Sequence, residues 1–245
     1  IKSEEDIIEG TDVPIIGTVP HMGRDKDKIK VFLSPKSSVA EAYRNIRTNL
    51  QFMQIKGKPH VIALTSTVGG EGKTSCCINL GGIMSMSDKK TIILSLDMRK
   101  PTMHEKFGLQ NKVGMSNLLS GAASLSDVIQ HTEYENLDIV ASGPIPPNPN
   151  ELIQSEFMLK VIEKLKEIYD VIIMDTPPIG LVADARILMH YADTSIYVLR
   201  ADYSEKAYFR SVNNLAKEEI GSFTILLNDV KSTHGGYGYG NGDGY

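Results

Sequence analysis

The chain has 245 residues, of which 41% are apolar and 23% are charged, a composition typical of an ordinary folded protein. Its 26 basic and 30 acidic residues give a formal net charge of -4, so nucleic acid is not an expected partner. The two cysteines, Cys76 and Cys77, are adjacent and lack metal-ligand spacing. No apolar run approaches the roughly 20 residues that cross a bilayer, so we expect any membrane attachment to lie outside this stretch of sequence.

The first 54 residues predict an arm followed by a helix. Residues 1–36 mix charges with turn formers, which indicates a short helix, an extended piece at 13–20 and a polar linker. Residues 38–54 then place apolar side chains at helical spacing, and Ser37 or Ser38 can cap the first turn. We therefore predict an amphipathic helix there.

Six short apolar runs follow, and each is typical of a strand buried on both faces of a parallel sheet. They are residues 60–66, 90–96, 137–142, 169–175, 194–200 and 222–228. Helical stretches separate them, at residues 73–87, 118–130 in broken pieces, 151–168, 182–192 and 205–219. This alternation predicts an α/β fold with a mostly parallel central sheet, helices on both faces, and ligands at the carboxyl ends of the strands.

The strongest functional motif is STVGGEGKTS, which stands between the first of these strands and the next helix. Its three glycines leave the backbone free to turn N–H groups toward a polyphosphate. Lys73 adds a positive charge for the β- and γ-phosphates, and the hydroxyl of Thr74 can bind Mg²⁺. Thr67 stands where the usual motif has its first glycine, but the strand–loop–helix context favours binding of ATP or GTP. The predicted binding residues are Gly69, Gly70, Glu71, Gly72, Lys73, Thr74 and Ser75.

Two further strands deliver carboxylates to the same edge of the sheet. Asp175 ends the run YDVIIMD and can hold Mg²⁺, directly or through water. Asp97 follows the run TIILSL and suits Mg²⁺ or a hydroxyl proton, while Arg99 suits the charge on a transferred phosphoryl group. Read alone, this Asp-x-Arg pattern is more typical of a surface ion pair.

Together the phosphate loop, the strand ending LDMRKP, the segment GPIPPNPNEL and the run IIMDTPP resemble the cytoplasmic kinase domain of bacterial tyrosine kinases. These enzymes are tied to the export of capsular and extracellular polysaccharide. The likeness runs from about Ser38 to the C-terminus and extends weakly to residues 13–20. The family that it indicates lies in the MinD/ParA-like branch of P-loop proteins.

The resemblance implies a kinase domain over residues 37–230 that takes ATP and Mg²⁺. The implied catalytic residues are Lys73, Asp97 and Arg99, and the implied metal ligands are Thr74, Asp97 and Asp175. Asn228, at the end of the last predicted strand, matches an asparagine that contacts the nucleotide base in related P-loop proteins.

One position departs from the family pattern. The family's second motif usually reads D-x-D-x-R, whereas residues 95–99 read SLDMR, so Ser95 replaces an aspartate of the Mg²⁺ site that is a candidate base for the acceptor tyrosine. Serine supplies neither the charge nor a competent base at neutral pH. Either Asp97 covers both tasks, or the chain is an impaired or deliberately altered kinase. A second hypothesis is that the chain binds nucleotide, hardly turns it over, and acts as a nucleotide-gated assembly module.

The main rival from another class is a MinD/ParA-like ATPase that dimerises face to face around nucleotide. Those ATPases carry a signature lysine five residues before the P-loop lysine, and Val68 stands at that position here. The kinase is therefore the favoured hypothesis.

Three charged residues recur at steps of three in the helix at 38–54, namely Glu41, Arg44 and Arg47. This spacing places them along one side of the helix, where the plain interpretation is a solvated charged face. The family uses an E-x-x-R-x-x-R element at this location to join subunits. The resemblance therefore implies a ring-shaped homo-oligomer.

The C-terminal sequence GGYGYGNGDGY has no aliphatic residue to bury, so residues 231–245 are expected to form a flexible tail. The resemblance implies that its tyrosines, Tyr237, Tyr239 and Tyr245, are phosphorylated between subunits, and that this regulates polysaccharide synthesis and export. It also implies a phosphotyrosine phosphatase as partner and a place on the cytoplasmic face of the bacterial inner membrane. Residues 1–36 would then be a juxtamembrane arm, joined to a transmembrane region of the same chain or to a membrane-spanning adaptor.

Overall fold

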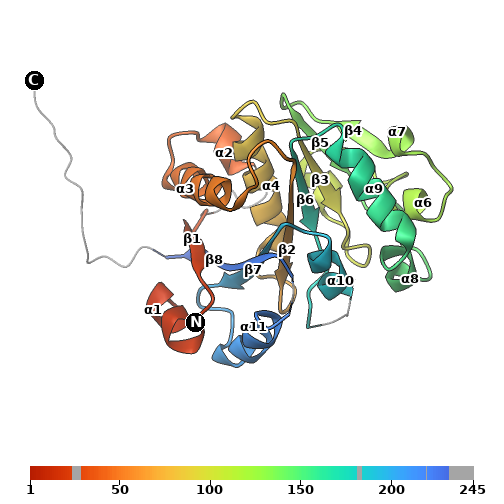
Figure 1. Cartoon of the computed structure of the whole chain (residues 1–245). Helices are drawn as coiled ribbons and strands as arrows, with labels where there is room; N and C mark the ends of the chain where they lie inside the picture. The colour runs from red at the N-terminus through yellow and green to blue at the C-terminus, as the bar shows by residue number, and fades with distance from the viewer. Residues whose placement is uncertain (24–28, 181–183, 219, 232–245) are drawn as a thin grey trace, which may run out of the picture.

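The fold is described from a computed structural model that covers residues 1–23, 29–180, 184–218 and 220–231. An eight-stranded sheet with the order β1-β8-β7-β2-β6-β3-β5-β4 runs through its centre, with helices on both faces (Figure 1). The strands pair in parallel except β4, which pairs antiparallel with β5. The predicted α/β architecture is confirmed.

All six predicted strands are present, with bounds that differ by only a few residues. They are β2 (His60–Ser66), β3 (Thr91–Ser95), β5 (Leu137–Val140), β6 (Val171–Asp175), β7 (Thr194–Arg200) and β8 (Ser222–Val230). Alternate residues of each strand enter opposite cores, so that Ile92 and Leu94 face one side of the sheet and Ile93 the other. Burial on both faces explains why these strands read as continuous apolar runs.

Two strands at the edges of the sheet lie outside the six predicted runs: the first falls in the piece predicted to be extended at 13–20, and the second begins at the end of the stretch predicted as broken helix at 118–130. β1 (Ile15–Pro20) pairs in parallel with β8, and β4 (Ile129–His131) pairs with β5. Edge strands are only partly covered, so their side chains do not form a continuous apolar run. Residues 15–20 belong to the predicted arm, and the structure builds this part of it into the sheet, with Ile16 and Val19 buried in the core.

One face of the sheet is covered by α2 (Lys30–Leu33), α3 (Ser38–Met53) and α4 (Lys73–Ser85). The predicted amphipathic helix is α3, and its cap is Ser37, whose hydroxyl oxygen accepts a hydrogen bond from the backbone N–H of Ala40 at 3.2 Å. The buried stripe of α3 packs toward the sheet and consists of Val39, Tyr43, Ile46 and Leu50.

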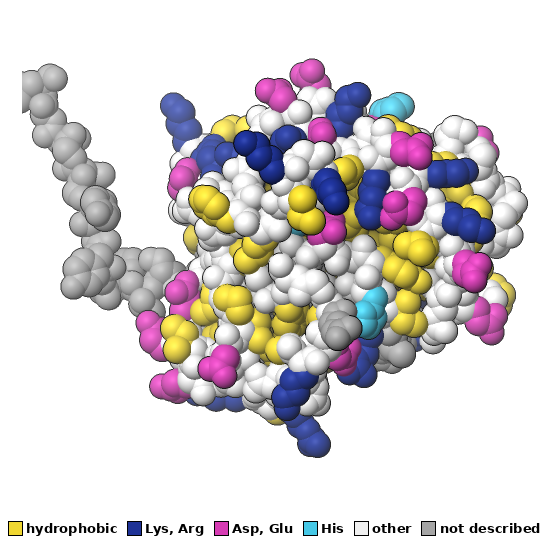
Figure 2. All heavy atoms as spheres, in the orientation of Figure 1, with side chains coloured by type: hydrophobic (Ala, Val, Ile, Leu, Met, Phe, Trp, Pro, Cys, Tyr) yellow, Lys and Arg dark blue, Asp and Glu magenta, His cyan; other side chains and the backbone are white. Residues whose placement is uncertain are grey.

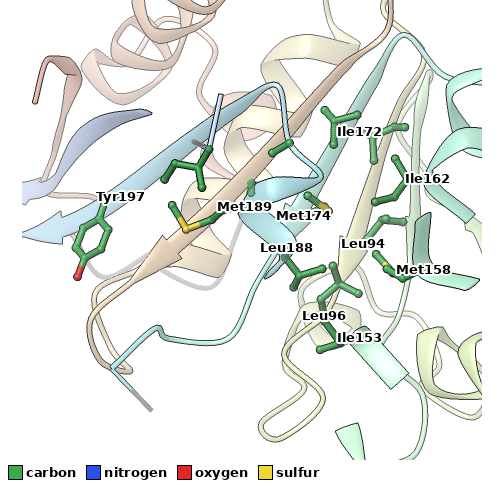
Figure 3. Close-up of a cluster of buried hydrophobic side chains, with 14 of the residues drawn as sticks. Leu94, Leu96, Ile153, Met158, Ile162, Ile172, Met174, Leu188, Met189 and Tyr197 are labelled. Atoms are coloured by element: carbon green, nitrogen blue, oxygen red, sulfur yellow. The ribbon is translucent and has the colours of Figure 1, made fainter. Parts of the chain in front are cut away.

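The opposite face is covered by a second set of helices. They are α6 (Met115–Leu119), α7 (Leu125–Val128), α8 (Pro149–Ile153), α9 (Glu156–Lys166), α10 (Asp184–His190) and α11 (Phe209–Leu215), with α1 (Glu4–Gly10) beside α11 (Figure 1). Figure 3 shows the core on this side, where Leu94 and Met174 from the sheet meet Leu188 of α10 and Ile162 of α9. The predicted helix at 151–168 is divided into α8 and α9, because Ser155 adopts an extended conformation between them.

Two short elements complete the fold, α5 (Met103–Lys106) after β3 and the 3-10 turn η1 (Lys206–Tyr208) before α11. Among the described residues no helix is long and apolar enough to cross a bilayer. On the face seen in Figure 2, basic and acidic side chains are interspersed, so no single sign of charge dominates it.

Candidate nucleotide-binding site

The predicted phosphate loop connects β2 to α4 at the carboxyl edge of the sheet. Gly70 and Gly72 adopt left-handed backbone conformations, with φ of 89° and 90°. At Gly72 the constraint is double, because a side chain there would also collide with the amide of Asn228. The loop therefore needs glycine at these positions, as the motif predicted.

A buried cluster forms around the carboxylate of Asp175, at the end of β6. Lys73 Nζ lies 2.7 Å from Asp175 Oδ1, and the Thr74 hydroxyl donates to Oδ2, also at 2.7 Å. Burial by itself lowers the pKa of Lys73. The carboxylate of Asp175 and the other neighbours of Lys73 outweigh this effect, so that the pKa of the lysine is raised. The structure thus brings together three residues that the sequence predicted for phosphate and Mg²⁺.

Ser95, the residue that departs from the family pattern, lies beside this cluster. It ends β3 and pairs with Asp175 in the register of β3 and β6, and its side chain is buried. The next residue, Leu96, donates its backbone N–H to the Asp175 carbonyl at 2.9 Å. An aspartate at position 95 would therefore enter the environment of Asp175.

Asp97 and Arg99 occupy the turn that follows β3. Asp97 Oδ1 accepts long hydrogen bonds from the backbone N–H groups of Arg99 and Lys100, both at 3.3 Å. The guanidinium of Arg99 donates to Asn150 of α8 at 2.8 Å and lines a hollow with residues 147–151. The structure therefore joins the predicted Arg99 to the segment GPIPPNPNEL, which lies far from it in the sequence.

Asn228, in β8, lies directly against the phosphate loop. Its Nδ2 donates to the carbonyl of Glu71 at 3.0 Å, while its Oδ1 is buried and has no hydrogen-bond partner among the described residues. The side chain of Glu71 accepts from the backbone N–H of Val68 at 3.0 Å and from the hydroxyl of Ser204. Burial raises the pKa of Glu71, in part offset by these donors.

The structure separates the three charged residues predicted on α3. Glu41 and Arg44 form a pair at the surface, with 2.7 Å between Oε2 and a guanidinium nitrogen. Arg47 instead reaches the C-terminal end of α4, where it donates to the carbonyl of Ile83 at 3.3 Å and to the hydroxyl of Ser87. A cation at a helix C-terminus is favourable, so Arg47 joins α3 to α4 within the domain.

Two residues at the site had no sequence signal. Arg200 at the end of β7 and Tyr203 just after it donate to the phosphate-loop carbonyls of Gly70 and Gly69, both at 2.8 Å. The one available indication was that the predicted strand at 194–200 ends at the same edge of the sheet as the phosphate loop. The predicted phosphoacceptors Tyr237, Tyr239 and Tyr245 lie outside the described residues.

Comparison with known proteins assigns the chain to a family. Residues 59–218 match the family described as AAA domain. The tyrosine-protein kinase YwqD of Bacillus subtilis is 38% identical over 207 residues, which cover 84% of this chain and 87% of that relative. The solved kinase domain of the Escherichia coli tyrosine kinase ETK is 28% identical, with a TM-score of 0.87 over 98% of this chain and all of that one. The chimerical protein CapA2B2 is 32% identical, with a TM-score of 0.84 over 94% of this chain and all of that one.

The MinD structure of Pyrococcus horikoshii also matches, but less extensively. It is 25% identical, with a TM-score of 0.60, and the match covers 69% of this chain and 70% of that one. The fold is thus shared with MinD, while the matched tyrosine kinases cover more of the chain at higher similarity. The chain therefore belongs to the bacterial tyrosine kinases, the family that the phosphate loop and its two partner strands had indicated.

Proposed function

We propose that the chain is an ATP-dependent tyrosine autokinase that phosphorylates the tail residues Tyr237, Tyr239 and Tyr245 between subunits. In this proposal the modification regulates synthesis and export of capsular or extracellular polysaccharide. The observation that carries it is the buried cluster of Lys73, Thr74 and Asp175 beside a phosphate loop in a chain of this family.

The residues of the cluster suit Mg²⁺ and a triphosphate. The Thr74 hydroxyl and the Asp175 carboxylate are oxygen ligands of the kind that Mg²⁺ prefers. Lys73 stays protonated at neutral pH although it is buried, because the Asp175 carboxylate helps to raise its pKa, and on nucleotide binding it exchanges Asp175 for the β- and γ-phosphates. Bound Mg²⁺ would supply neutralisation of the phosphate charge. The backbone that surrounds the bound phosphates in this proposal belongs to Gly69, Gly70, Glu71, Gly72 and Ser75.

Asp97 and Arg99 take the acceptor side of the reaction in this proposal. Asp97 receives the proton of the tyrosine hydroxyl and is a further ligand of the metal site. The hydrogen bonds that its carboxylate accepts from the backbone are long and weak, so they compete little with a proton or a metal ion for its oxygen atoms. Arg99, held by Asn150, faces the charge on the transferred phosphoryl group. Catalysis is then mainly positioning and charge neutralisation.

Asn228 gives the site its preference for ATP over GTP in this proposal. Its buried Oδ1 lacks a partner among the described residues and can accept a hydrogen bond from the exocyclic amine of adenine. Its Nδ2 already donates to the Glu71 carbonyl, which fixes the orientation of the amide.

Replacing Asn228 with alanine is expected to weaken ATP binding about tenfold, because the base loses an acceptor and the phosphate loop loses a donor. GTP binding should change less. Displacement of a fluorescent ADP by each nucleotide measures both affinities. Asn213→Ala is the matched control, since Asn213 of α11 bonds to Gly10 and Thr11 rather than to the phosphate loop. Unchanged ATP affinity in Asn228→Ala would remove the base-contact role.

The kinase reaction itself is tested by incubating the protein with Mg-ATP and measuring phosphotyrosine on the tail by mass spectrometry. Phosphate on the tail tyrosines is the expected result. Binding of ATP with no phosphotyrosine would instead favour the nucleotide-gated assembly module, which the buried Ser95 beside Asp175 keeps as the second candidate.

We also propose that the subunits form a ring through α3, with Glu41 and Arg44 at the interface. Both side chains reach the surface, and an Arg fork suits a carboxylate across an interface. Arg47 is the third residue of the family's E-x-x-R-x-x-R element, which joins subunits. Here its contact with α4 sets the position of α3.

A Glu41→Ala, Arg44→Ala double variant is expected to lower the solution mass to that of a monomer without lowering the melting temperature by more than about 2 °C. Loss of one exposed ion pair costs only about 0.3–0.5 kcal/mol within a helix. Light scattering measures the mass with and without ATP. The matched control is Glu163→Ala, Lys166→Ala, which removes an equivalent pair from α9. A dimer that forms only with ATP would contradict the ring and support the MinD/ParA-like alternative.

The cellular setting is proposed from the family resemblance. The chain works on the cytoplasmic face of the bacterial inner membrane, held by a transmembrane region of its own protein or by a membrane-spanning adaptor, and a phosphotyrosine phosphatase reverses the modification. Residues 1–36 are the juxtamembrane arm, whose strand β1 is part of the kinase sheet, and residues 231–245 are the substrate tail.

A further inference from the structure

Three consecutive carbonyls of the phosphate loop each accept a hydrogen bond from a side chain outside the loop. Tyr203 Oη donates to Gly69, a guanidinium nitrogen of Arg200 donates to Gly70, both at 2.8 Å, and Asn228 donates to Glu71 at 3.0 Å. The three donors come from the end of β7, the turn after it and β8. The loop is therefore held along its backbone by two adjacent strands.

This arrangement determines where the loop's N–H groups point. In a trans peptide the carbonyl and the following N–H point in opposite directions. Holding the carbonyls of Gly69 and Gly70 toward Tyr203 and Arg200 therefore turns the N–H groups of Gly70 and Glu71 the other way. Inward-facing N–H groups in succession form the nest that binds phosphate.

Arg200 is itself fixed in place. Its Nε and one terminal nitrogen both lie 2.8 Å from Asp229 Oδ2, which leaves the other terminal nitrogen for Gly70. Its guanidinium carbon lies 5.1 Å from the centre of the Tyr203 ring, so the two side chains support each other. The backbone N–H of Arg200 also donates to Ser204, whose hydroxyl donates to the side chain of Glu71.

Tyr203 holds this position although its side chain is half exposed. Stability of the fold does not require an exposed phenol to order itself against a glycine carbonyl. A loop that must present its N–H groups to a ligand gains from such ordering, because preorganisation lowers the cost of binding.

We propose that Arg200 and Tyr203 are positioning residues that preorganise the phosphate loop and so set the affinity for nucleotide. The proposal rests on nucleotide binding at this loop as proposed above. Neither side chain takes part in phosphoryl transfer, and both act through the backbone of Gly69 and Gly70.

The test measures the dissociation constant of Mg-ADP by calorimetry for Tyr203→Phe and Arg200→Lys. Phenylalanine keeps the ring over Arg200 and removes only the donor, while lysine keeps the charge but has one nitrogen in place of the three that bind Asp229 and Gly70. Each variant is expected to bind about three- to tenfold more weakly, as for the loss of one hydrogen bond. The melting temperature without nucleotide should stay within about 2 °C, and the turnover rate at saturating ATP within about twofold.

The control variant is Tyr134→Phe, which removes a phenol hydroxyl from a ring stacked on Phe32 before β5, away from the phosphate loop. It should bind Mg-ADP as the unaltered protein does. Wild-type affinity in both test variants would overturn the proposal. A loss of affinity that merely follows a fall in melting temperature would overturn it as well. Failure of the unaltered protein to bind Mg-ADP would instead reject the proposed function.

Discussion

Replacing Lys73 with methionine is expected to abolish phosphotyrosine on the tail, with a fall in rate of at least about 100-fold. Methionine is close to lysine in length but cannot neutralise the phosphates. In this structure Lys73 carries a raised pKa, so its charge is present throughout the neutral range, and no other cation is bonded to Asp175 among the described residues. Mass spectrometry of the tail after exposure to Mg-ATP measures the loss.

The same substitution is expected to lower stability, because it leaves the Asp175 carboxylate buried without its cation. The side chains of Lys73 and Asp175 are only 7% and 3% exposed. Removing one partner of a buried pair typically costs about 3–5 kcal/mol, although the Thr74 hydroxyl still donates to Asp175 and reduces the loss.

A Lys73→Met, Asp175→Asn double variant separates the two effects. It removes both charges, so its melting temperature should recover relative to Lys73→Met, while phosphorylation stays absent. Denaturation of the three proteins in parallel makes the comparison. Phosphotyrosine on the tail of either variant would remove the kinase reaction from this phosphate loop.

The sequence predicted the central strands and the cluster around Asp175 for the same physical reason. Strands buried on both faces leave continuous apolar runs, and parallel strands bring their carboxyl ends to one edge. The amino-acid pattern alone therefore predicts that the phosphate-loop motif, which connects β2 to α4, lies close to the aspartate that ends β6. The 2.7 Å contact between Lys73 and Asp175 confirms that step.

The parts that could not be predicted depend on tertiary contacts. β1 is an edge strand with a mixed pattern, so residues 15–20 looked like part of an arm. The spacing of Arg47 indicated its side of α3 but not its contact with the end of α4. Arg200 and Tyr203 are ordinary residues in the sequence, and their bonds to loop carbonyls arise because β7 ends beside the phosphate loop.

Restoring the aspartate at position 95 is expected to raise the rate of tail phosphorylation about 100-fold or more, the usual contribution of a positioned general base. Ser95 pairs with Asp175 in the sheet, so the new carboxylate would enter next to the proposed metal site. It would supply both a Mg²⁺ ligand and a base for the acceptor hydroxyl. Ser95→Asn is the matched control, since it has the shape of aspartate without the charge.

The added carboxylate should also make stability depend on the metal. Without Mg²⁺, Ser95→Asp places a second negative charge beside the buried Asp175 on the neighbouring strand. Repulsion between the two carboxylates disfavours the folded state. Mg-ADP should then raise the melting temperature of Ser95→Asp more than that of the unaltered protein or of Ser95→Asn. If the unaltered chain phosphorylates its tail and Ser95→Asp does so no faster, Asp97 already serves as the base, and the serine is no impairment.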